Sequence, residues 1–258
     1  VAGFDTAAVC GVAVTALADG SPHYLDRAGT VRVQLLQGTL ASCTEAALLN
    51  GANVARLGAE IVQFSTATLI GQGLYELGGL LRGRRGTESA TAAHSVGEPF
   101  VLLTTGAVQF VPALLTDRGR AYGFRALTNG QTLGDAIDTS FTYGLLTLQP
   151  LAPTHVVASR AAGVGSDLTL SWKRRARRNG DWIDYVDVPL DEPAELYDVE
   201  IMNGGAVVRS FSGLTAQTLT YTAAQQSADW GAVPALFTVR VYQLSAHYGR
   251  GQRTVAVV

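Results

Sequence analysis

The chain has 258 residues, of which 47% are hydrophobic and 16% charged, so it can bury a sizeable core and is not a disordered segment. Its formal net charge of −2 argues against a dedicated duplex-DNA binder, because such proteins carry a basic surface that neutralises phosphates. The length exceeds that of a usual single β domain and predicts about two domains.

Short apolar and β-branched runs recur along the chain with turn residues between them, which is typical of an all-β protein. Residues 1–17 are apolar, but Asp5 interrupts them and no basic residue precedes them, so we predict a strand rather than a signal peptide. No run approaches the roughly 18 uninterrupted apolar residues of a membrane helix. Because the chain starts at Val1 and not at Met, we expect it to be a segment of a larger polypeptide.

The stretch 30–38, TVRVQLLQG, predicts a half-buried strand, because Val31, Val33 and Leu35 share one face at a period of two. Further runs that are bounded by Gly, Pro, Asp or Asn predict strands as well. In the first half of the chain these runs are 59–70, 73–81, 98–106, 120–127 and 140–149.

The stretch SCTEAALLNG predicts one helix of about two turns. Ser42 or Thr44 can serve as its N-cap, and Asn50 with Gly51 can end it. It is the only helix that we expect. The predicted fold class is therefore mainly β, with one short helix in a strand-rich first domain.

A domain boundary is expected near the middle of the chain. Pro150 and Pro153 in QPLAPTHV make a stiff, extended connector of the kind found between domains. We therefore divide the chain into residues 1–149 and 150–258. The second part holds seven strand-like runs, the number expected of a two-sheet sandwich. They are 155–160, 167–174, 195–202, 206–211, 218–223, 236–244 and 253–258.

The second domain resembles a fibronectin type III module. DLTLSW matches its second strand, ELYDVEI its third, and LFTVRVYQLSAHYGRG its sixth strand with the following turn. Trp172 alternates with Leu168 and Leu170 and is expected to point inward, and we place Tyr197 and Phe237 in the same core. Phe237 stands where the family's tyrosine corner usually sits, so the hydroxyl that would bond back to the chain is missing.

One stretch, GLLRGRRGTE, places three arginines on a tight turn. Gly83 and Gly86 supply the positive φ that such a turn needs, and Arg82, Arg84 and Arg85 are then expected to point outward. Three guanidinium groups on a short turn suit the carboxylates of a neighbouring subunit, and the alternative is the phosphates of passing DNA. We favour the subunit contact, because a net-acidic chain offers no continuous basic path.

The sequence holds no HExxH, GxSxG, phosphate-loop or CxxC motif, and its four histidines are scattered. We therefore expect no enzyme activity, no cofactor and no metal. Cys10 and Cys43 are expected to be small buried hydrophobes rather than a disulfide. Trp182 and Trp230 are candidates for stacking on sugar rings, although packing under their own loops is the favoured alternative.

Three blocks follow one another in the first domain: VRVQLLQGTLASCTEAALLNGANVARLGAEIVQF, YELGGLLRGRRGTE and HSVGEPFVLL. By their order and spacing this domain resembles the region just ahead of a fibronectin module in tail-tip hub proteins of long-tailed bacteriophages and gene transfer agents, related to the lambda-type host-specificity protein. The resemblance implies the C-terminal portion of a trimeric hub that closes the distal end of a tail tube.

The resemblance also implies the surroundings of the protein. Its partners would be two further copies in a homotrimer, other tail or baseplate proteins and fibres, and a host surface receptor, with DNA contact at most transient. Its place would be the virion tail tip, after assembly in the bacterial host cytoplasm. We therefore expect a structural protein with a role in host attachment and DNA delivery; the alternative is a secreted carbohydrate- or protein-binding module with a fibronectin type III domain.

Overall fold

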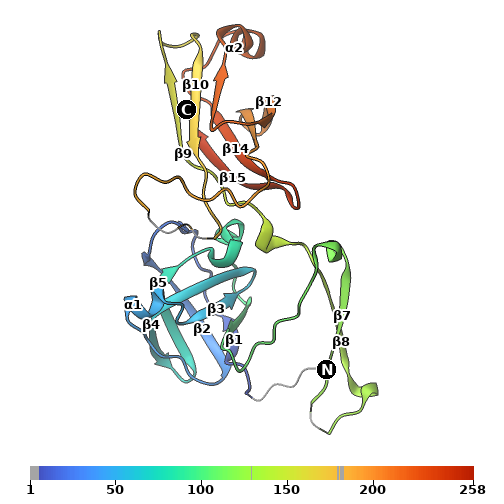
Figure 1. Ribbon diagram of the computed structural model, residues 1–258. Coiled ribbons are helices and arrows are strands. Elements are labelled where there is room, and N and C mark those ends of the chain that lie inside the picture. The colour runs from blue at the N-terminus through green and yellow to red at the C-terminus, as the bar shows by residue number, and fades with distance from the viewer. Residues whose placement is uncertain (1–5, 129, 179, 181–182) are drawn as a thin grey trace. The chain divides into compact units, whose positions relative to one another are not determined.

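A computed structural model describes residues 6–128, 130–178, 180 and 183–258 (Figure 1). The chain forms two compact units, Val1–Ala113 and Leu114–Val258. Strands dominate both units, so the mainly β fold class is confirmed. The expected boundary between residues 149 and 150 stays a prediction. No helix in the described part of the chain is long and apolar enough to cross a membrane.

The first unit contains a closed β-barrel. Its described strands are all antiparallel to their neighbours and follow the order β1-β2-β5-β4-β3-β6 around the barrel. The elements are β1 (Cys10–Ala13), β2 (Asp26–Gln37), α1 (Glu45–Leu49), β3 (Val54–Leu57), β4 (Glu60–Gly71), β5 (Leu74–Leu81) and β6 (Pro99–Leu102). Closure satisfies the backbone groups that an open sheet would leave unpaired at its edges.

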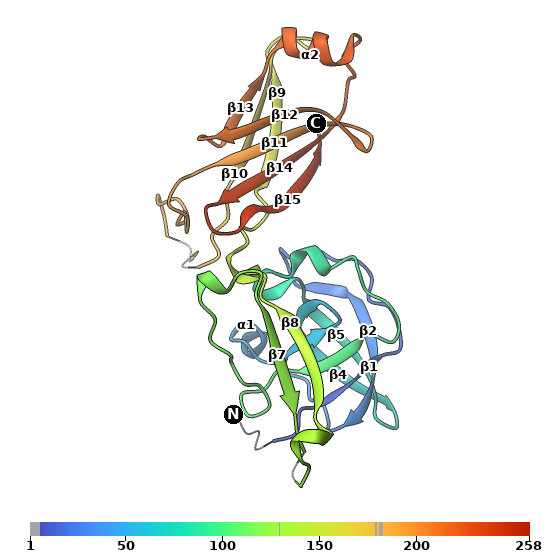
Figure 2. The same ribbon diagram turned by 90° about the vertical axis from the view of Figure 1, so that its right-hand side faces the viewer.

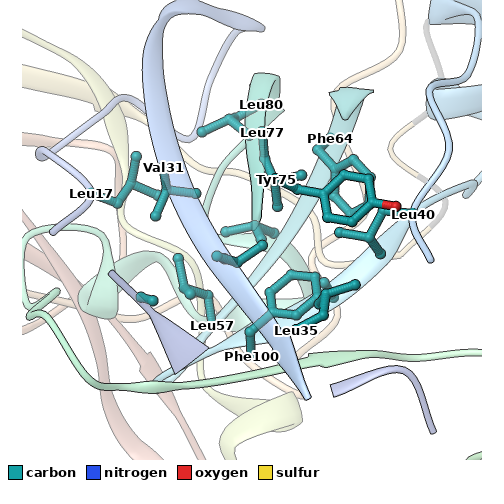
Figure 3. Packing of buried hydrophobic residues seen from close by; sticks show 14 residues of the cluster. Leu17, Val31, Leu35, Leu40, Leu57, Phe64, Tyr75, Leu77, Leu80 and Phe100 are labelled. Atoms are coloured by element: carbon teal, nitrogen blue, oxygen red, sulfur yellow. The ribbon is translucent and has the colours of Figure 1, made fainter. Parts of the chain in front are cut away.

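Apolar side chains fill the barrel interior (Figure 3). Val31, Val33 and Leu35 on β2 are all buried, so the predicted strand and its inward face are confirmed. The rings of Phe64 and Phe100 lie with their centroids 6.5 Å apart. The rest of this core is Ala13, Leu17, Leu40, Ala55, Leu57, Val62, Tyr75, Leu77 and Leu80.

The predicted helix is present as α1, packed beside the barrel. Thr44 is its N-cap, and the side-chain oxygen of Thr44 accepts a hydrogen bond from the backbone N–H of Ala47 at 3.2 Å. Asn50 is the residue at which the helix ends. Leu48 is fully buried and fastens this short helix. Local capping and one apolar anchor are therefore enough to hold it.

The inward-facing alternation of β5 changes phase at a glycine. Before it, Tyr75 points into the barrel; after it, Leu80 and Arg82 do. Gly79 has a φ of 58°, and a Cβ at this position would lie 2.0 Å from the Ser65 hydroxyl oxygen. A side chain there would displace the Ser65 hydroxyl and hold a strained positive φ, which favours glycine at the point where the phase changes.

The second unit contains a fibronectin type III-like β-sandwich (Figure 2). Its sheets have the orders β13-β10-β9 and β12-β11-β14-β15, with antiparallel pairing throughout. All seven runs expected here form strands: β9 (Thr154–Arg160), β10 (Leu168–Lys173), β11 (Tyr197–Asn203), β12 (Ala206–Leu214), β13 (Thr218–Tyr221), β14 (Thr238–Ser245) and β15 (Gly249–Val257).

The sandwich core is built around aromatic side chains. Trp172 and Tyr197 come from opposite sheets and are fully buried, with ring centroids 5.3 Å apart in an edge-to-face arrangement. Phe237 is also buried, and its backbone N–H donates to the carbonyl of Val258 at 3.0 Å. These three residues therefore lie in the core positions at which we placed them.

The expectation of a single helix is wrong, because a second helix, α2 (Ala223–Trp230), precedes β14. Its start is a capping box in which Thr222 accepts from the backbone of Gln225, while the Gln225 side chain accepts from the backbone of Thr222. Thr-x-x-Gln is a recognised helix start. The next residue, Gln226, is buried, and its side-chain amide donates to the carbonyls of Ser166 and Tyr221.

A separate two-stranded ribbon in the second unit pairs β7 (Ala121–Ala126) with β8 (Ile137–Thr142), which lie side by side in Figures 1 and 2. β7 falls within the run 120–127 that the sequence predicts as a strand. β8 shares only residues 140–142 with the expected run 140–149, and the later part of that run contains a 3-10 turn instead. Short 3-10 turns complete the described structure: η1 (Arg84–Gly86), η2 (Glu88–Ala90), η3 (Leu115–Asp117), η4 (Leu133–Asp135) and η5 (Leu146–Leu148).

Replacing Trp172 by alanine is expected to lower the free energy of unfolding of the sandwich by about 3–5 kcal/mol, because it opens a large cavity beside Tyr197. Urea denaturation followed by circular dichroism measures this change. Val157→Ala, which shortens an exposed side chain on β9, is the control and should change the free energy by less than about 0.5 kcal/mol. Equal effects of the two substitutions would contradict this account of the core.

Candidate functional site

The arginine turn follows β5 directly, and its three arginines do not share one environment. Arg84 and Arg85 are exposed, as predicted, but Arg82 has only 1% of its surface exposed. The expectation that all three point outward is therefore wrong for Arg82. The alternation of inward-facing side chains changes phase at Gly79, so Arg82, the residue directly after β5, faces the interior.

Arg82 is fully engaged inside the barrel unit. Its Nε donates to the two carboxylate oxygens of Glu60 at 3.1 and 3.2 Å, and its Nη2 donates to Glu60 Oε2 at 3.0 Å. Nη1 donates to the carbonyl of Ala18 and Nη2 to that of Thr91, both at 2.8 Å. Nη1 also lies 3.7 Å from Asp26 Oδ2. The guanidinium thus joins two loops to strand β4.

His94 extends this arrangement. Its Nε2 lies 2.6 Å from Glu60 Oε2 and its Nδ1 lies 2.6 Å from Glu98 Oε1. A neutral imidazole has one N–H donor, so two such contacts require a second proton, on the ring or on one of the carboxyl groups. We refer to Glu60, Arg82, His94 and Glu98 as the charge cluster.

The charge cluster is almost completely shielded from water. The side chains of Glu60 and Arg82 have no exposed surface, and those of His94 and Glu98 are 1% and 10% exposed. Charges in such a place are tolerated only when each is paired and hydrogen-bonded. The geometry therefore fits a structural clamp that fixes the base of the arginine turn.

The turn itself presents two cations on a constrained backbone. Gly83 has a φ of 58°, and its N–H donates to Glu60 Oε1; a Cβ at Gly83 would lie 2.8 Å from the Cα of Glu88. Arg85 also has a positive φ, 55°, which costs a non-glycine residue of the order of 1 kcal/mol. Arg84 Nε donates to Gln63 Oε1 at 3.1 Å. The exposed guanidinium of Arg85 is thus presented by a backbone that the clamp holds in place.

The tryptophans proposed for sugar stacking have different outcomes. Trp182 lies outside the described residues. Trp230 ends α2 and is partly buried: its indole N–H donates to the Tyr221 hydroxyl at 3.0 Å, and its ring lies 5.6 Å from that of Phe237. This environment matches the alternative that we favoured, packing within the domain.

The Tyr221 hydroxyl leads on to an ion pair. It donates to Asp229 Oδ2 at 2.6 Å, and Arg209 donates to both oxygens of Asp229 at 2.5 and 2.7 Å. The hydrogen bonds from Arg209 hold the pKa of Asp229 below its ordinary value of 3.8. Burial, with the adjacent carboxylate, raises the pKa of Tyr221 to about 12. Trp230 is therefore the end of a hydrogen-bonded chain that starts at Arg209.

The long segment between β10 and β11 is held by arginines near its start. Arg174 pairs with Asp187 and with Glu195, at 3.1 Å in both cases, and Arg177 pairs with Glu192 at 2.8 Å. These contacts use two of the five basic residues at 173–178, a run that Ala176 interrupts. They tie the start of the segment to carboxylates that come later in it.

The described residues contain no group of three or more His, Cys, Asp or Glu side chains arranged to hold a metal ion. Cys10 and Cys43 are both half-buried free thiols, and the Sγ of Cys43 lies 3.6 Å from the carbonyl oxygen of Phe64. The prediction that these two cysteines do not form a disulfide is therefore confirmed.

Comparisons with known proteins give one family match. Residues 8–101 match the family model described as "Rcc01698-like, C-terminal". This range covers β1 to β6 almost completely and so coincides with the barrel. No curated protein matches the chain.

Three solved structures illustrate what this chain is similar to. Domains d3–d4 of the rat CD45 extracellular region share 16% identity and a TM-score of 0.31, over 60% of this chain and 71% of that one. The FN5 domain of Drosophila Lar shares 18% identity and a TM-score of 0.26, over 42% of this chain and 94% of that one. A structure titled "Myokine structure" shares 14% identity and a TM-score of 0.27, over 42% of this chain and 95% of that one. The fibronectin-type fold of the second unit follows from its own strand order.

Replacing Glu60 by glutamine is expected to destabilise the barrel by about 3 kcal/mol or more, because it leaves Arg82 buried without a counter-charge. Hydrogen exchange of the β4 and β5 amides reports on this unit directly. The matched control is Glu45→Gln, which removes the exposed 2.8 Å pair with Arg27 and should cost less than about 1 kcal/mol. If the amides of both variants exchanged at the wild-type rate, the Glu60–Arg82 pair would not contribute to the stability of the barrel.

The lowered pKa of Asp229 predicts an acid dependence of the sandwich. A carboxyl group with a folded-state pKa below its unfolded value stabilises the fold above the unfolded value, near 3.8, and loses this contribution as the pH falls through the folded value. Asp229→Asn is therefore expected to be less stable than wild type at neutral pH, with a shallower loss of stability below about pH 4. Urea denaturation at a series of pH values tests this. Parallel curves for the two proteins would contradict it.

Proposed function

We propose that this chain is a structural part of a phage-like tail tip or baseplate hub, which links the distal tail tube to receptor-binding or fibre proteins. In this proposal the barrel belongs to the hub, and the fibronectin type III-like sandwich is a docking or adhesive domain. The chain would act in host attachment and DNA delivery, as one of three copies, at the virion tail tip.

The observation that carries the proposal is how the barrel uses the sequence blocks that resemble tail-tip hub proteins. The three blocks are residues 31–64, 75–88 and 94–103, and all lie within or just beyond the range matched by the family model. Each block contributes to the charge cluster: Glu60 from the first, Arg82 from the second, His94 and Glu98 from the third. The three blocks thus meet in one buried cluster of the barrel unit.

The exposed arginines support an assembly role. The clamp fixes the base of the turn, and Arg84 and Arg85 stand on it at the surface. A guanidinium held by a rigid backbone loses little freedom on binding, which favours recognition of carboxylates on a neighbouring subunit.

The first test is electron microscopy of particles from the producing culture, with gold-labelled antibody raised against this chain. We expect the label at the distal tail tip, and preimmune antibody is the control. Label absent from tails, with the protein free in the medium, would overturn the proposal. It would then favour the secreted binding module, which a polysaccharide-binding assay on the free chain would examine.

A second test concerns the arginine turn. Arg84→Ala together with Arg85→Ala is expected to reduce incorporation of the chain into tails, by roughly tenfold if the two groups contribute about 1.4 kcal/mol. Its melting temperature should fall only by the small amount that loss of the Arg84–Gln63 hydrogen bond causes. Arg27→Ala, another exposed arginine of the barrel unit, is the matched control. Normal incorporation of the double variant would remove the turn from the interface.

A further inference from the structure

His94 lies between two carboxyl groups of the charge cluster, and each of its ring nitrogens faces one of them. Nε2 lies 2.6 Å from Glu60 Oε2, and Nδ1 lies 2.6 Å from Glu98 Oε1. The His94 side chain is 1% exposed, so its ring is shielded from water. A neutral ring has a hydrogen for one of these contacts only. The position of the second proton therefore decides what the ring does.

The contact with Glu60 takes its hydrogen from the ring. The two oxygens of Glu60 accept from Arg82 at 3.0 to 3.2 Å, and one of them also accepts from the backbone N–H of Gly83. A protonated Glu60 would leave the buried guanidinium without the charge to which it is bonded. Glu60 is therefore ionised, and His94 Nε2 carries the hydrogen that joins the two side chains.

The charges around the ring favour a second proton on Nδ1. Asp26, Glu60 and Glu98 bring three carboxyl groups to this place, whereas Arg82 brings one guanidinium, with Nη1 3.7 Å from Asp26 Oδ2. With a neutral ring, negative charge would exceed positive charge by two in a place that is almost cut off from water. A proton on Glu98 would reduce this excess, but only a proton on His94 also sets a cation beside Glu60.

The ring belongs to the segment 91–98, which runs from the end of η2 to the start of β6. At the start of this segment Arg82 Nη2 holds a backbone carbonyl at 2.8 Å. His94 then fastens the segment to Glu60, the first residue of β4. The same carboxylate accepts from the N–H of Gly83, so it anchors both the segment and the base of the arginine turn.

We propose that His94 is a proton-dependent latch. As an imidazolium it holds the segment 91–98 on the barrel through both carboxylates. When the ring loses one proton, Nδ1 and Glu98 Oε1 become two acceptors that face each other, and the segment comes away from the barrel. Because Glu60 also anchors the arginine turn, the presentation of Arg85 changes with the segment. The latch goes beyond the proposed function and does not depend on it.

Nuclear magnetic resonance of the whole chain, with nitrogen-15 in its histidine rings, tests the protonation of His94. At about pH 7.5 a histidine in water is mostly neutral. We expect a directly bonded hydrogen on both ring nitrogens of His94 at this pH. Through-bond correlation assigns the signals, and the exposed rings of His155 and His247 are the internal reference. A single protonated nitrogen in the His94 ring would overturn the proposal.

Urea denaturation at a series of pH values tests the latch itself, with the amide signals of β4 and β5 as the readout of the barrel. A histidine of the unfolded chain loses its proton near about pH 6.5, whereas the folded cluster keeps one. Above this value the folded chain binds more protons than the unfolded chain, so its stability falls as the pH rises. We expect the unfolding equilibrium constant to rise by up to about tenfold per pH unit between about pH 6.5 and 8.

Three variants separate the latch from other causes of this pH dependence. His247→Gln, which replaces an exposed histidine, is the matched control and should keep the wild-type dependence. His94→Gln should lose it, because glutamine does not titrate. If that variant does not fold, Glu98→Gln carries the test: its amide oxygen can still accept from Nδ1, but one of the two charges that hold the proton is gone, so stability should begin to fall at a lower pH.

Three results would overturn the latch. They are a wild-type barrel whose stability stays constant over this pH range, a His94→Gln barrel that keeps the wild-type dependence, and a Glu98→Gln barrel that does the same. Each result can be read whether or not the chain is found in tails.

Discussion

The ion pair between Arg82 and Glu60 is the constraint on which the surroundings of the arginine turn depend. Neither side chain has exposed surface, so water solvates neither charge and each depends on the other for stabilisation. The same guanidinium holds the carbonyls of Ala18 and Thr91, and the same carboxylate holds the N–H of Gly83. One buried contact thus sets the course of two loops and of the turn. The stability of this end of the barrel and the presentation of Arg85 are therefore coupled.

Strands were predictable wherever burial follows a period of two without interruption. Val31, Val33 and Leu35 in the barrel and Leu168, Leu170 and Trp172 in the sandwich are of this kind, and each is buried. Prediction failed where a local rule met an exception. The inward-facing alternation of β5 changes phase at Gly79. An uninterrupted alternation from Tyr75 and Leu77 would place the Arg82 side chain on the outer face of the barrel. The short strand β3 and the helix α2 were missed, although Thr222 and Gln225 form a capping box that is visible in the sequence.

The charge cluster could not be found from local patterns. Glu60, Arg82 and His94 are separated by more than ten residues each, and only the closure of the barrel brings them within hydrogen-bonding distance. The core aromatics of the sandwich were accessible because alternation places them. Trp230 could not be placed in this way, because it lies outside any run of alternating apolar residues. Its contact with Tyr221 depends on the tertiary packing of α2, which Trp230 ends.

The ribbon also bears on how the chain opens. Neither β7 nor β8 belongs to the barrel sheet or to the sandwich sheets, so their hydrogen bonds can break without disturbing either core. Backbone amides in such a segment exchange by local fluctuation, while those of the barrel and the sandwich wait for cooperative unfolding. A protease that cuts between Leu102 and Thr154 would accordingly leave two folded pieces rather than one unfolded chain.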